Sequence, residues 1–133
     1  MRYLVDSDWV IDYLEGEPDA LQLLLNLADE GIAISIVTYM EVYQGVARNP
    51  RRQDAEEELS RFLENVPVLP ISLSIARRCA ELRETLRAQQ KQVQRRALDL
   101  LIAATALEHS LTVVTRNLQD YSDVPTLLMH QPS

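Results

Sequence analysis

The chain has 133 residues, the length of one domain, and 47% of them are apolar, which is enough to build a hydrophobic core. Its net charge is −7, which disfavours a general attraction to nucleic acid over the whole surface. The single cysteine, Cys79, excludes an internal disulfide and a zinc site made of thiolates, and isolated glycines exclude a Gly-rich phosphate loop.

The chain also lacks the patterns of export and membrane insertion. No apolar run reaches the ~18 residues that a membrane span needs, and residues 1–14 carry acids where a signal peptide would be apolar. A lone free thiol suits a reducing compartment. We therefore expect a cytoplasmic protein with no membrane partner.

The hydrophobic pattern predicts strands that alternate with helices. Expected strands cover residues 2–5, 32–36, 66–71 and 111–114, with a weak last strand at 127–129. Expected helices cover residues 8–14, 20–27, 38–48, 51–65, 72–88 and 98–107. Such alternation predicts an α/β fold with a mostly parallel sheet of about five strands, covered by helices on both faces.

Helix-capping signals accompany two of these expected helices. Ser7 or Asp8 can cap the helix that follows the first strand. Thr38 and Glu41 fit a capping box, in which a hydroxyl is followed three residues later by Glu. The helix over residues 98–107 is apolar nearly all round, which is typical of a helix buried on more than one side.

Three acids occupy equivalent places in this pattern. Asp6 follows a strand, Glu41 lies in the first turn of a helix that follows a strand, and Asp99 lies in the first turn of the apolar helix. In a parallel sheet these three positions lie at one edge, the carboxyl ends of the strands, where ligand and active sites are usually found. Carboxylates gathered there repel one another unless one is protonated or a divalent cation joins them. Mg²⁺ or Mn²⁺ prefers such oxygen ligands.

Each acid also has a purely structural interpretation. Asp6 can be a helix cap, Glu41 can serve only its capping box, and Asp99 can merely complement the helix dipole. The metal-site hypothesis therefore depends on the coincidence of the three. The histidines, His109 and His130, lie in poor contexts for catalysis.

Basic residues concentrate in residues 77–96, where only Glu81 and Glu84 oppose them, so the segment carries about +5. They are Arg77, Arg78, Arg83, Arg87, Lys91, Arg95 and Arg96. This segment is either a solvated helix face or a surface for phosphate or an acidic partner.

The chain resembles the PIN-domain ribonucleases, and among them the VapC-type toxins of type II toxin–antitoxin pairs. Three stretches carry the resemblance: YLVDSDWVIDYL, SIVTYMEVYQGV and LDLLIAATALEHSLTVVTRNLQDY. It covers the full length, so it implies that residues 1–133 form a single PIN-like domain, a three-layer α/β/α sandwich. It also implies Asp6, Glu41 and Asp99 as the metal-binding acids.

The resemblance implies further roles around these acids. The family often has a fourth acid or an Asn just past the late strand, where this chain has Asn117 as a catalytic candidate. Asp120, three residues later, is a candidate to support the metal ligands or to hold a second metal ion. Ser7 and Thr115 are candidates to support the metal ligands. Candidate RNA or phosphate contacts are Arg116, Arg95, Arg96 and Lys91.

The implied activity is hydrolysis of RNA phosphodiesters by a water that Mg²⁺ or Mn²⁺ activates. The implied partners are a structured RNA, a second copy in a homodimer, and an antitoxin whose C-terminal segment covers the active-site groove. Leu21, Leu24, Leu25, Phe62 and Leu63 can line that groove or can simply belong to the core.

Two alternatives remain at this point. A catalytically degenerate PIN domain would act only as a binding module, which Asn117 and the negative charge favour. A haloacid-dehalogenase-type phosphatase would use Asp6 as its nucleophile in the sequence Asp6-Ser7-Asp8-Trp9-Val10. That class needs a downstream lysine after a strand, whereas Lys91 lies in a polar connection.

Overall fold

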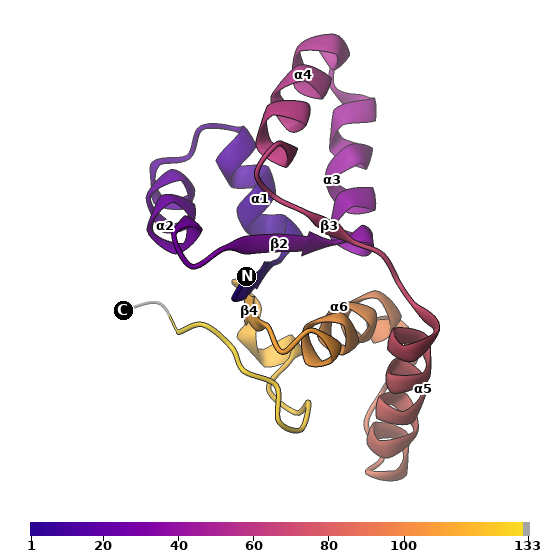
Figure 1. The fold of residues 1–133 in the computed structure, drawn as a ribbon. Coiled ribbons are helices and arrows are strands. Elements are labelled where there is room, and N and C mark those ends of the chain that lie inside the picture. The colour runs from indigo at the N-terminus through magenta and orange to yellow at the C-terminus, as the bar shows by residue number, and fades with distance from the viewer. Residues whose placement is uncertain (132–133) are drawn as a thin grey trace.

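The computed structural model describes residues 1–131, and within them four parallel strands form one sheet (Figure 1). The strand order is β3–β2–β1–β4. The strands are β1 (Tyr3–Val5), β2 (Ile32–Ser35), β3 (Val68–Leu69) and β4 (Thr112–Val114). Because β1 and β4 pair in register over their whole length, the residues that follow them, Asp6 and Thr115, leave the sheet side by side.

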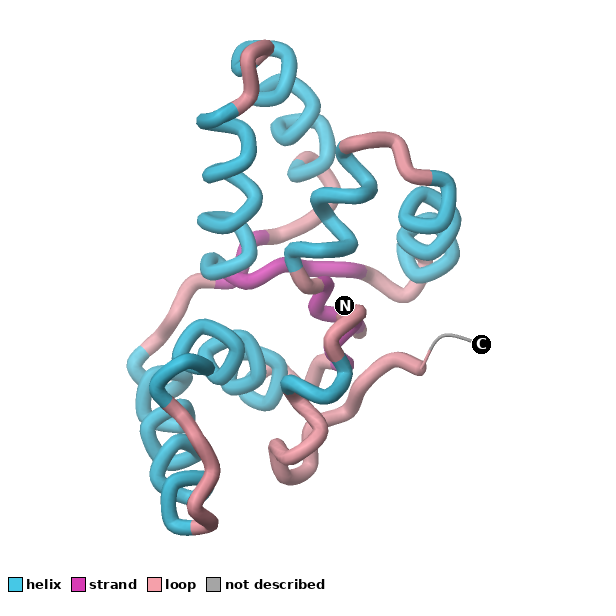
Figure 2. The backbone as a smooth tube through the Cα atoms, turned by 180° about the vertical axis from the view of Figure 1, so that it is seen from behind, coloured by secondary structure: helices cyan, strands magenta, loops and turns pink. Residues whose placement is uncertain are grey.

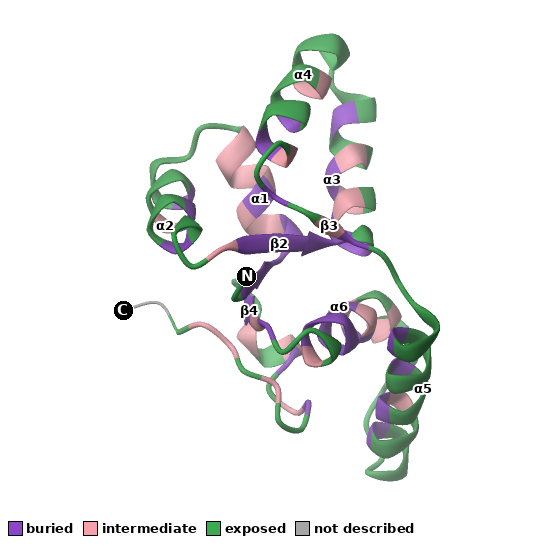
Figure 3. Cartoon of the chain, viewed as in Figure 1, coloured by how far each residue is buried: buried purple, intermediate pink, exposed green. Residues whose placement is uncertain are grey.

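The strands are short apolar runs because helices bury both of their faces. Along β1 the side chains alternate: Tyr3 and Val5 enter the cluster on one face, and Leu4 enters the cluster on the other. Leu4 is aligned with Ala33 of β2 and Val113 of β4, and none of these three is exposed. In Figure 3, β1 and β2 are accordingly coloured as buried.

Helices cover the sheet in two layers (Figures 1 and 2). One layer contains α1 (Ser7–Leu14), α2 (Pro18–Ala28), α3 (Ile36–Arg48) and α4 (Arg52–Leu63). The other contains α5 (Leu73–Ala88) and α6 (Ala97–Glu108), with the chain after β4 packed against them. Short 3₁₀ turns, η1 (Gln94–Arg96) and η2 (Leu118–Asp120), flank α6 and β4. The predicted three-layer α/β/α sandwich with a parallel sheet is confirmed.

The sheet is smaller than the sequence predicts. The expected strand over 66–71 is reduced to Val68–Leu69, because the prolines on both sides lack the N–H that a ladder needs. The expected last strand over 127–129 is a single parallel bridge between Met129 and Val113. The positive φ of Thr126, 65°, turns the chain just before this bridge.

Two capping predictions are wrong. Helix α3 begins at Ile36, and its cap is Ser35, whose hydroxyl accepts from the Thr38 N–H at 3.0 Å. Glu41 therefore lies beyond the first turn and has no role in a capping box. Helix α1 is capped by Asp6 rather than by Ser7 or Asp8, since Asp6 accepts from the Ser7 N–H.

Candidate active site

Asp6 is the most buried of the predicted acids, with 6% of its surface exposed. Its backbone N–H donates to the Val114 carbonyl at 2.9 Å, which fixes its place beside β4. Its Oδ1 accepts from the Ser7 N–H and its Oδ2 accepts from the Thr115 hydroxyl, both at 2.8 Å. Burial nevertheless raises the pKa of Asp6, and the charge of Asp8 adds to that rise.

Thr115 links this acid to the turn that follows β4. While its hydroxyl donates to Asp6, the same oxygen accepts from the Asn117 N–H at 3.0 Å. Thr115 is itself buried, so both partners are held in place without competition from water. The resemblance implies that Thr115 supports a metal ligand, and its hydrogen bond to Asp6 agrees with that role.

Tyr121, which sequence reasoning does not single out, lies between two of the acids. Its ring is 1% exposed, and its hydroxyl oxygen lies 3.4 Å from Oδ2 of Asp6 and 3.5 Å from Oδ1 of Asp99. The two carboxylates, one directly after β1 and the other in the first turn of α6, therefore lie on either side of the same hydroxyl. The nearby negative charges and burial raise the pKa of Tyr121 far above its usual range, so its hydroxyl keeps its proton.

Glu41 and Asp99 share the electrostatic field of this site. Burial is the main cause that raises the pKa of Glu41, and the charges of Asp6, Asp99 and Asp8 raise it further. The pKa of Asp99 is raised by burial first, then by the charges of Asp6 and Asp120, against the opposing charge of Arg96. The structure thus brings the three predicted acids into one region where their charges repel.

The fit to a metal ion follows from this arrangement. Within residues 1–131, no three His, Cys, Asp or Glu side chains are grouped closely enough to hold one ion together. Mg²⁺, however, keeps several waters and needs only one or two carboxylates. Asp6 and Asp99, which share the Tyr121 hydroxyl, offer oxygen ligands of that number. This donor set is of the chemical kind that a hydrated Mg²⁺ or Mn²⁺ ion takes, and the pKa of Glu41 is raised by the same charges.

Asn117 and Arg116 face α1 rather than these acids. The Asn117 amide donates to Oδ2 of Asp8 at 2.8 Å. The Arg116 guanidinium donates to Asp12 at 2.6 Å and lies 3.7 Å above the centre of the Trp9 ring. Both contacts are exposed. Because of the ion pair, the Arg116 guanidinium already has an acidic partner before an RNA phosphate approaches it.

The other candidate phosphate contacts differ in their surroundings: Arg96 is paired with an acid, whereas Lys91 and Arg95 are exposed. The Arg96 guanidinium donates to both carboxylate oxygens of Asp123, at 2.9 and 2.6 Å, and to the Asp120 carbonyl at 2.8 Å. It therefore joins the chain after η2 to the start of α6. Lys91 and Arg95 are exposed in the connection before α6. On α5, Arg78 is paired with Glu108, so part of the basic segment is neutralised.

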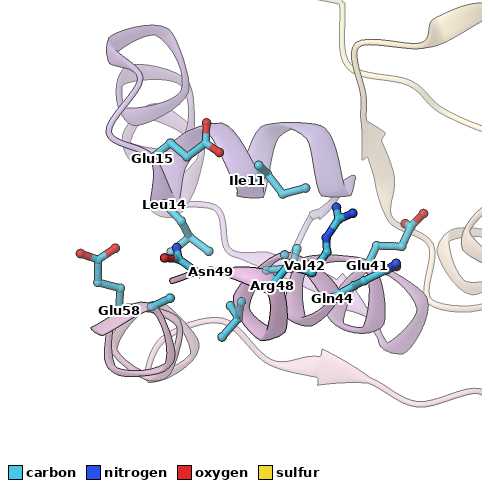
Figure 4. A pocket seen from close by; sticks show the side chains of 12 residues that line it. Ile11, Leu14, Glu15, Glu41, Val42, Gln44, Arg48, Asn49 and Glu58 are labelled. Atoms are coloured by element: carbon cyan, nitrogen blue, oxygen red, sulfur yellow. The ribbon is translucent and has the colours of Figure 1, made fainter. Parts of the chain in front are cut away.

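A pocket of about 330 Å³ lies between α1 and α3 and is closed by α4 (Figure 4). Glu41 lies at one end of it and Glu58 at the other, with Ile11, Leu14 and Val42 between them. The pocket therefore leads away from Glu41 and is lined by apolar side chains together with polar ones such as Gln44, Arg48 and Asn49.

The leucines proposed from sequence as groove residues behave differently from one another. Leu24 and Phe62 are buried, and Leu63 is partly buried, as core residues would be. Leu21 and Leu25 are 36% and 64% exposed, and Leu24, Leu25 and Phe62 also line a smaller pocket of about 230 Å³. Core burial is therefore confirmed for Leu24 and Phe62, and a role of the set in the active-site groove stays a prediction.

A parallel sheet between helical layers, with acids at the carboxyl ends of its strands, is the architecture that the sequence motifs indicate. The model of the PIN domain family matches residues 3–126. The chain belongs to the PIN domain family.

Full-length relatives agree with this assignment. Ribonuclease VapC2 of Rickettsia felis is 28% identical over 131 residues, covering 97% of this chain and 96% of that protein. The crystal structure of Rickettsia felis VapBC2 bound to a DNA fragment from their promoter is similar in fold, with a TM-score of 0.86, 24% identity and full coverage of both chains. A toxin–antitoxin complex from Klebsiella pneumoniae matches at 28% identity with a TM-score of 0.71, over 96% of both chains.

Proposed function

We propose that the acidic site binds Mg²⁺ or Mn²⁺ and that the chain uses it to hydrolyse phosphodiester bonds in RNA. The chain is a VapC-type ribonuclease, the toxin member of a toxin–antitoxin pair. The observation that carries the metal proposal is the meeting of Asp6 and Asp99 at Tyr121, within the field of Glu41. The PIN family match leaves the phosphatase alternative without support.

The side chains divide the work according to their surroundings. Asp6 and Asp99 would hold the ion, and the Ser7 N–H and Thr115 hydroxyl keep Asp6 in one orientation. When bound, the ion would polarise a phosphoryl oxygen and lower the pKa of an attacking water. Glu41 is half-buried with a raised pKa, which suits a group that orients this water and accepts its proton.

RNA must approach a protein whose net charge is −7. Lys91 and Arg95, exposed just before the helix that carries Asp99, are the cations that we propose as phosphate contacts. Arg96 and Arg116 already hold Asp123 and Asp12, so we assign them a smaller part. With few phosphate contacts, cleavage should depend only moderately on salt concentration.

The test is cleavage of a structured RNA with and without Mg²⁺ or Mn²⁺, comparing the wild type with Asp6→Asn and Asp99→Asn. We expect each variant to lose about 100-fold or more in kcat/KM, since removing a group that stabilises the transition state has effects of this order. Asp29→Asn, an exposed acid after α2, is the matched control. Equal activity in all four proteins would reject the mechanism. No cleavage by a wild type that still binds metal would favour the degenerate PIN domain.

We also propose that the chain forms a homodimer and is covered by its antitoxin. Large apolar side chains are exposed on α3 and around the starts of α5 and α6: Ile36, Met40, Ile71, Leu73 and Leu98. A face of this kind favours a protein partner. The apolar side chains of the pocket beside Glu41, such as Ile11, Leu14 and Val42, could contact a segment of the antitoxin. Sedimentation velocity of the chain alone and with the antitoxin separates the two assemblies.

The location that we propose is the cytoplasm. Cys79 is buried and unpaired, as is usual in a reducing compartment. Within residues 1–131, no helix is both long and apolar enough to cross a membrane.

A further inference from the structure

The Tyr121 hydroxyl is a polar group buried at the centre of the acidic site. Its ring belongs to the hydrophobic cluster beneath the sheet, which also contains Val124 and Ile102. The only hydrogen-bond acceptors within its reach in residues 1–131 are Asp6 and Asp99, at 3.4 and 3.5 Å. A hydroxyl has one proton and donates to one acceptor at a time, so it is shared between the two carboxylates.

The loop that carries this tyrosine is fastened to the helix that carries Asp99. Arg96, directly before α6, holds the carboxylate of Asp123 and the carbonyl of Asp120, on either side of Tyr121. The Tyr121 N–H donates to the Leu118 carbonyl at 3.1 Å, which closes the turn. The side chains of Arg96 and Asp123 are about 20% exposed, so water competes little with their pairing.

We propose that Tyr121 is a positioning residue that sets the spacing of Asp6 and Asp99 and thereby the affinity of the site for a divalent cation. This inference rests on the proposed function. Two carboxylates in a poorly hydrated site repel. Asp6 is already held by the Ser7 N–H and the Thr115 hydroxyl, so without a group between the two acids it is Asp99 that would turn away. A rigid phenol whose hydroxyl lies within reach of both carboxylates, and donates to one of them at a time, keeps their oxygens facing one another before the ion arrives. The ion then binds two carboxylates that are already in position, so less free energy is lost in ordering these side chains.

The variant that tests this role is Tyr121→Phe, which removes the oxygen and keeps the ring. We expect the affinity for Mn²⁺, measured by calorimetry on the RNA-free protein, to fall about tenfold, the lower end of what losing a partner of a metal ligand does. RNA cleavage should return to near the wild-type rate at saturating Mn²⁺. Wild-type Mn²⁺ affinity in Tyr121→Phe would overturn the proposal.

Tyr3→Phe is the matched control. The Tyr3 hydroxyl also donates to a carboxylate, that of Glu30 at 2.8 Å, but at the start of β1, the end of the strand opposite Asp6. We expect this variant to bind Mn²⁺ like the wild type. If Tyr3→Phe weakened Mn²⁺ binding as much as Tyr121→Phe, the effect would be a general one and the proposal would fail.

If Tyr121→Phe unfolds at a much lower temperature than Tyr3→Phe, a second variant, Asp123→Asn, tests whether the position of Tyr121 sets the Mn²⁺ affinity. Asp123→Asn keeps the hydroxyl and weakens the attachment of its loop to Arg96. Weaker Mn²⁺ binding in Asp123→Asn supports the proposal, and unchanged binding overturns it. A wild type that binds no Mn²⁺ at all would instead reject the proposed function, so the two failures are distinguishable.

Discussion

The two sides of the acidic site are built differently. On the side formed by β1, β4 and the chain after η2, Asp6, Thr115 and Tyr121 are 6%, 4% and 1% exposed, and hydrogen bonds join distant segments. On the side formed by α1 and α3, Glu41 is half-buried, and the contact between Asn117 and Asp8 is open to solvent. We call these the fixed side and the open side.

The difference in burial changes what each contact contributes. A hydrogen bond to a charged group in a buried site contributes about 1.5–3 kcal/mol, whereas an exposed polar pair contributes about 0.2–1 kcal/mol. The fixed side can therefore hold ligand atoms in place, and the open side can exchange its contacts for those of a substrate. A nuclease needs both, since the ion must be held while the RNA must enter and leave.

Apart from changes to the acids themselves, the largest effect should follow from loosening the fixed side with Thr115→Val. This change keeps the shape and removes the hydroxyl that donates to Asp6 and accepts from the Asn117 N–H. A loss of about 1.5–3 kcal/mol corresponds to roughly a 10- to 100-fold fall in kcat/KM for RNA cleavage. Thr105→Val is the control, because the Thr105 hydroxyl is equally buried but donates to Leu101 within α6. A decrease below threefold in Thr115→Val would show that Asp6 needs no such support.

A smaller effect concerns the stability of the metal-free protein as pH rises. Burial and neighbouring charges raise the pKa of Asp99 above the value of the unfolded chain, so the unfolded state releases its proton first. Ionisation then favours unfolding, and the folded state loses stability as pH rises through the raised pKa. Without metal, Asp99→Asn should therefore unfold a few degrees above the wild type at pH 7, and this advantage should vanish below the usual pKa of Asp.

Thermal unfolding between pH 3 and 8, in chelator and in excess Mg²⁺, measures this prediction. Mg²⁺ should raise the unfolding temperature of the wild type more than that of Asp99→Asn, because a ligand stabilises the state that binds it. A wild type that is more stable than Asp99→Asn in chelator at pH 7 would contradict the prediction. It would mean that a favourable contact of Asp99, such as the helix dipole, outweighs the repulsion.

The fold and the positions of the acids could be predicted because both depend on the order of apolar and polar residues over short stretches of the sequence. Apolar runs such as residues 2–5 and 111–114 must be strands buried on both faces, and acids directly after strands must reach the same edge. The start of α3 is two residues earlier than the sequence predicts. Ser35 and Thr38 are both good caps, and burial of Val37 in the core favours the earlier start.

On the fixed side, the place of Tyr121 could not be predicted, because its contacts join residues far apart in the chain. Nothing near Tyr121 in the sequence shows that its ring turns inward, since this depends on the pairing of Arg96 with Asp123. One general rule applies: a buried tyrosine hydroxyl must find a polar partner. Because the burial of Tyr121 is visible only in the structure, this rule could be applied to it only afterwards.

The smallest effect should come from the open side, with Asn117→Ala. Within residues 1–131 the Asn117 side-chain amide hydrogen-bonds only to the exposed carboxylate of Asp8, so its loss should change kcat/KM by threefold or less and leave Mn²⁺ affinity unchanged. Asn26→Ala, which removes the exposed contact between Gln22 and Asn26 on α2, is the matched control for the loss of an amide. A fall of 100-fold with Asn117→Ala would mean that Asn117 leaves Asp8 when RNA binds and acts on the substrate. The open side would then be as specialised as the fixed side and would differ from it only in being formed after the substrate arrives.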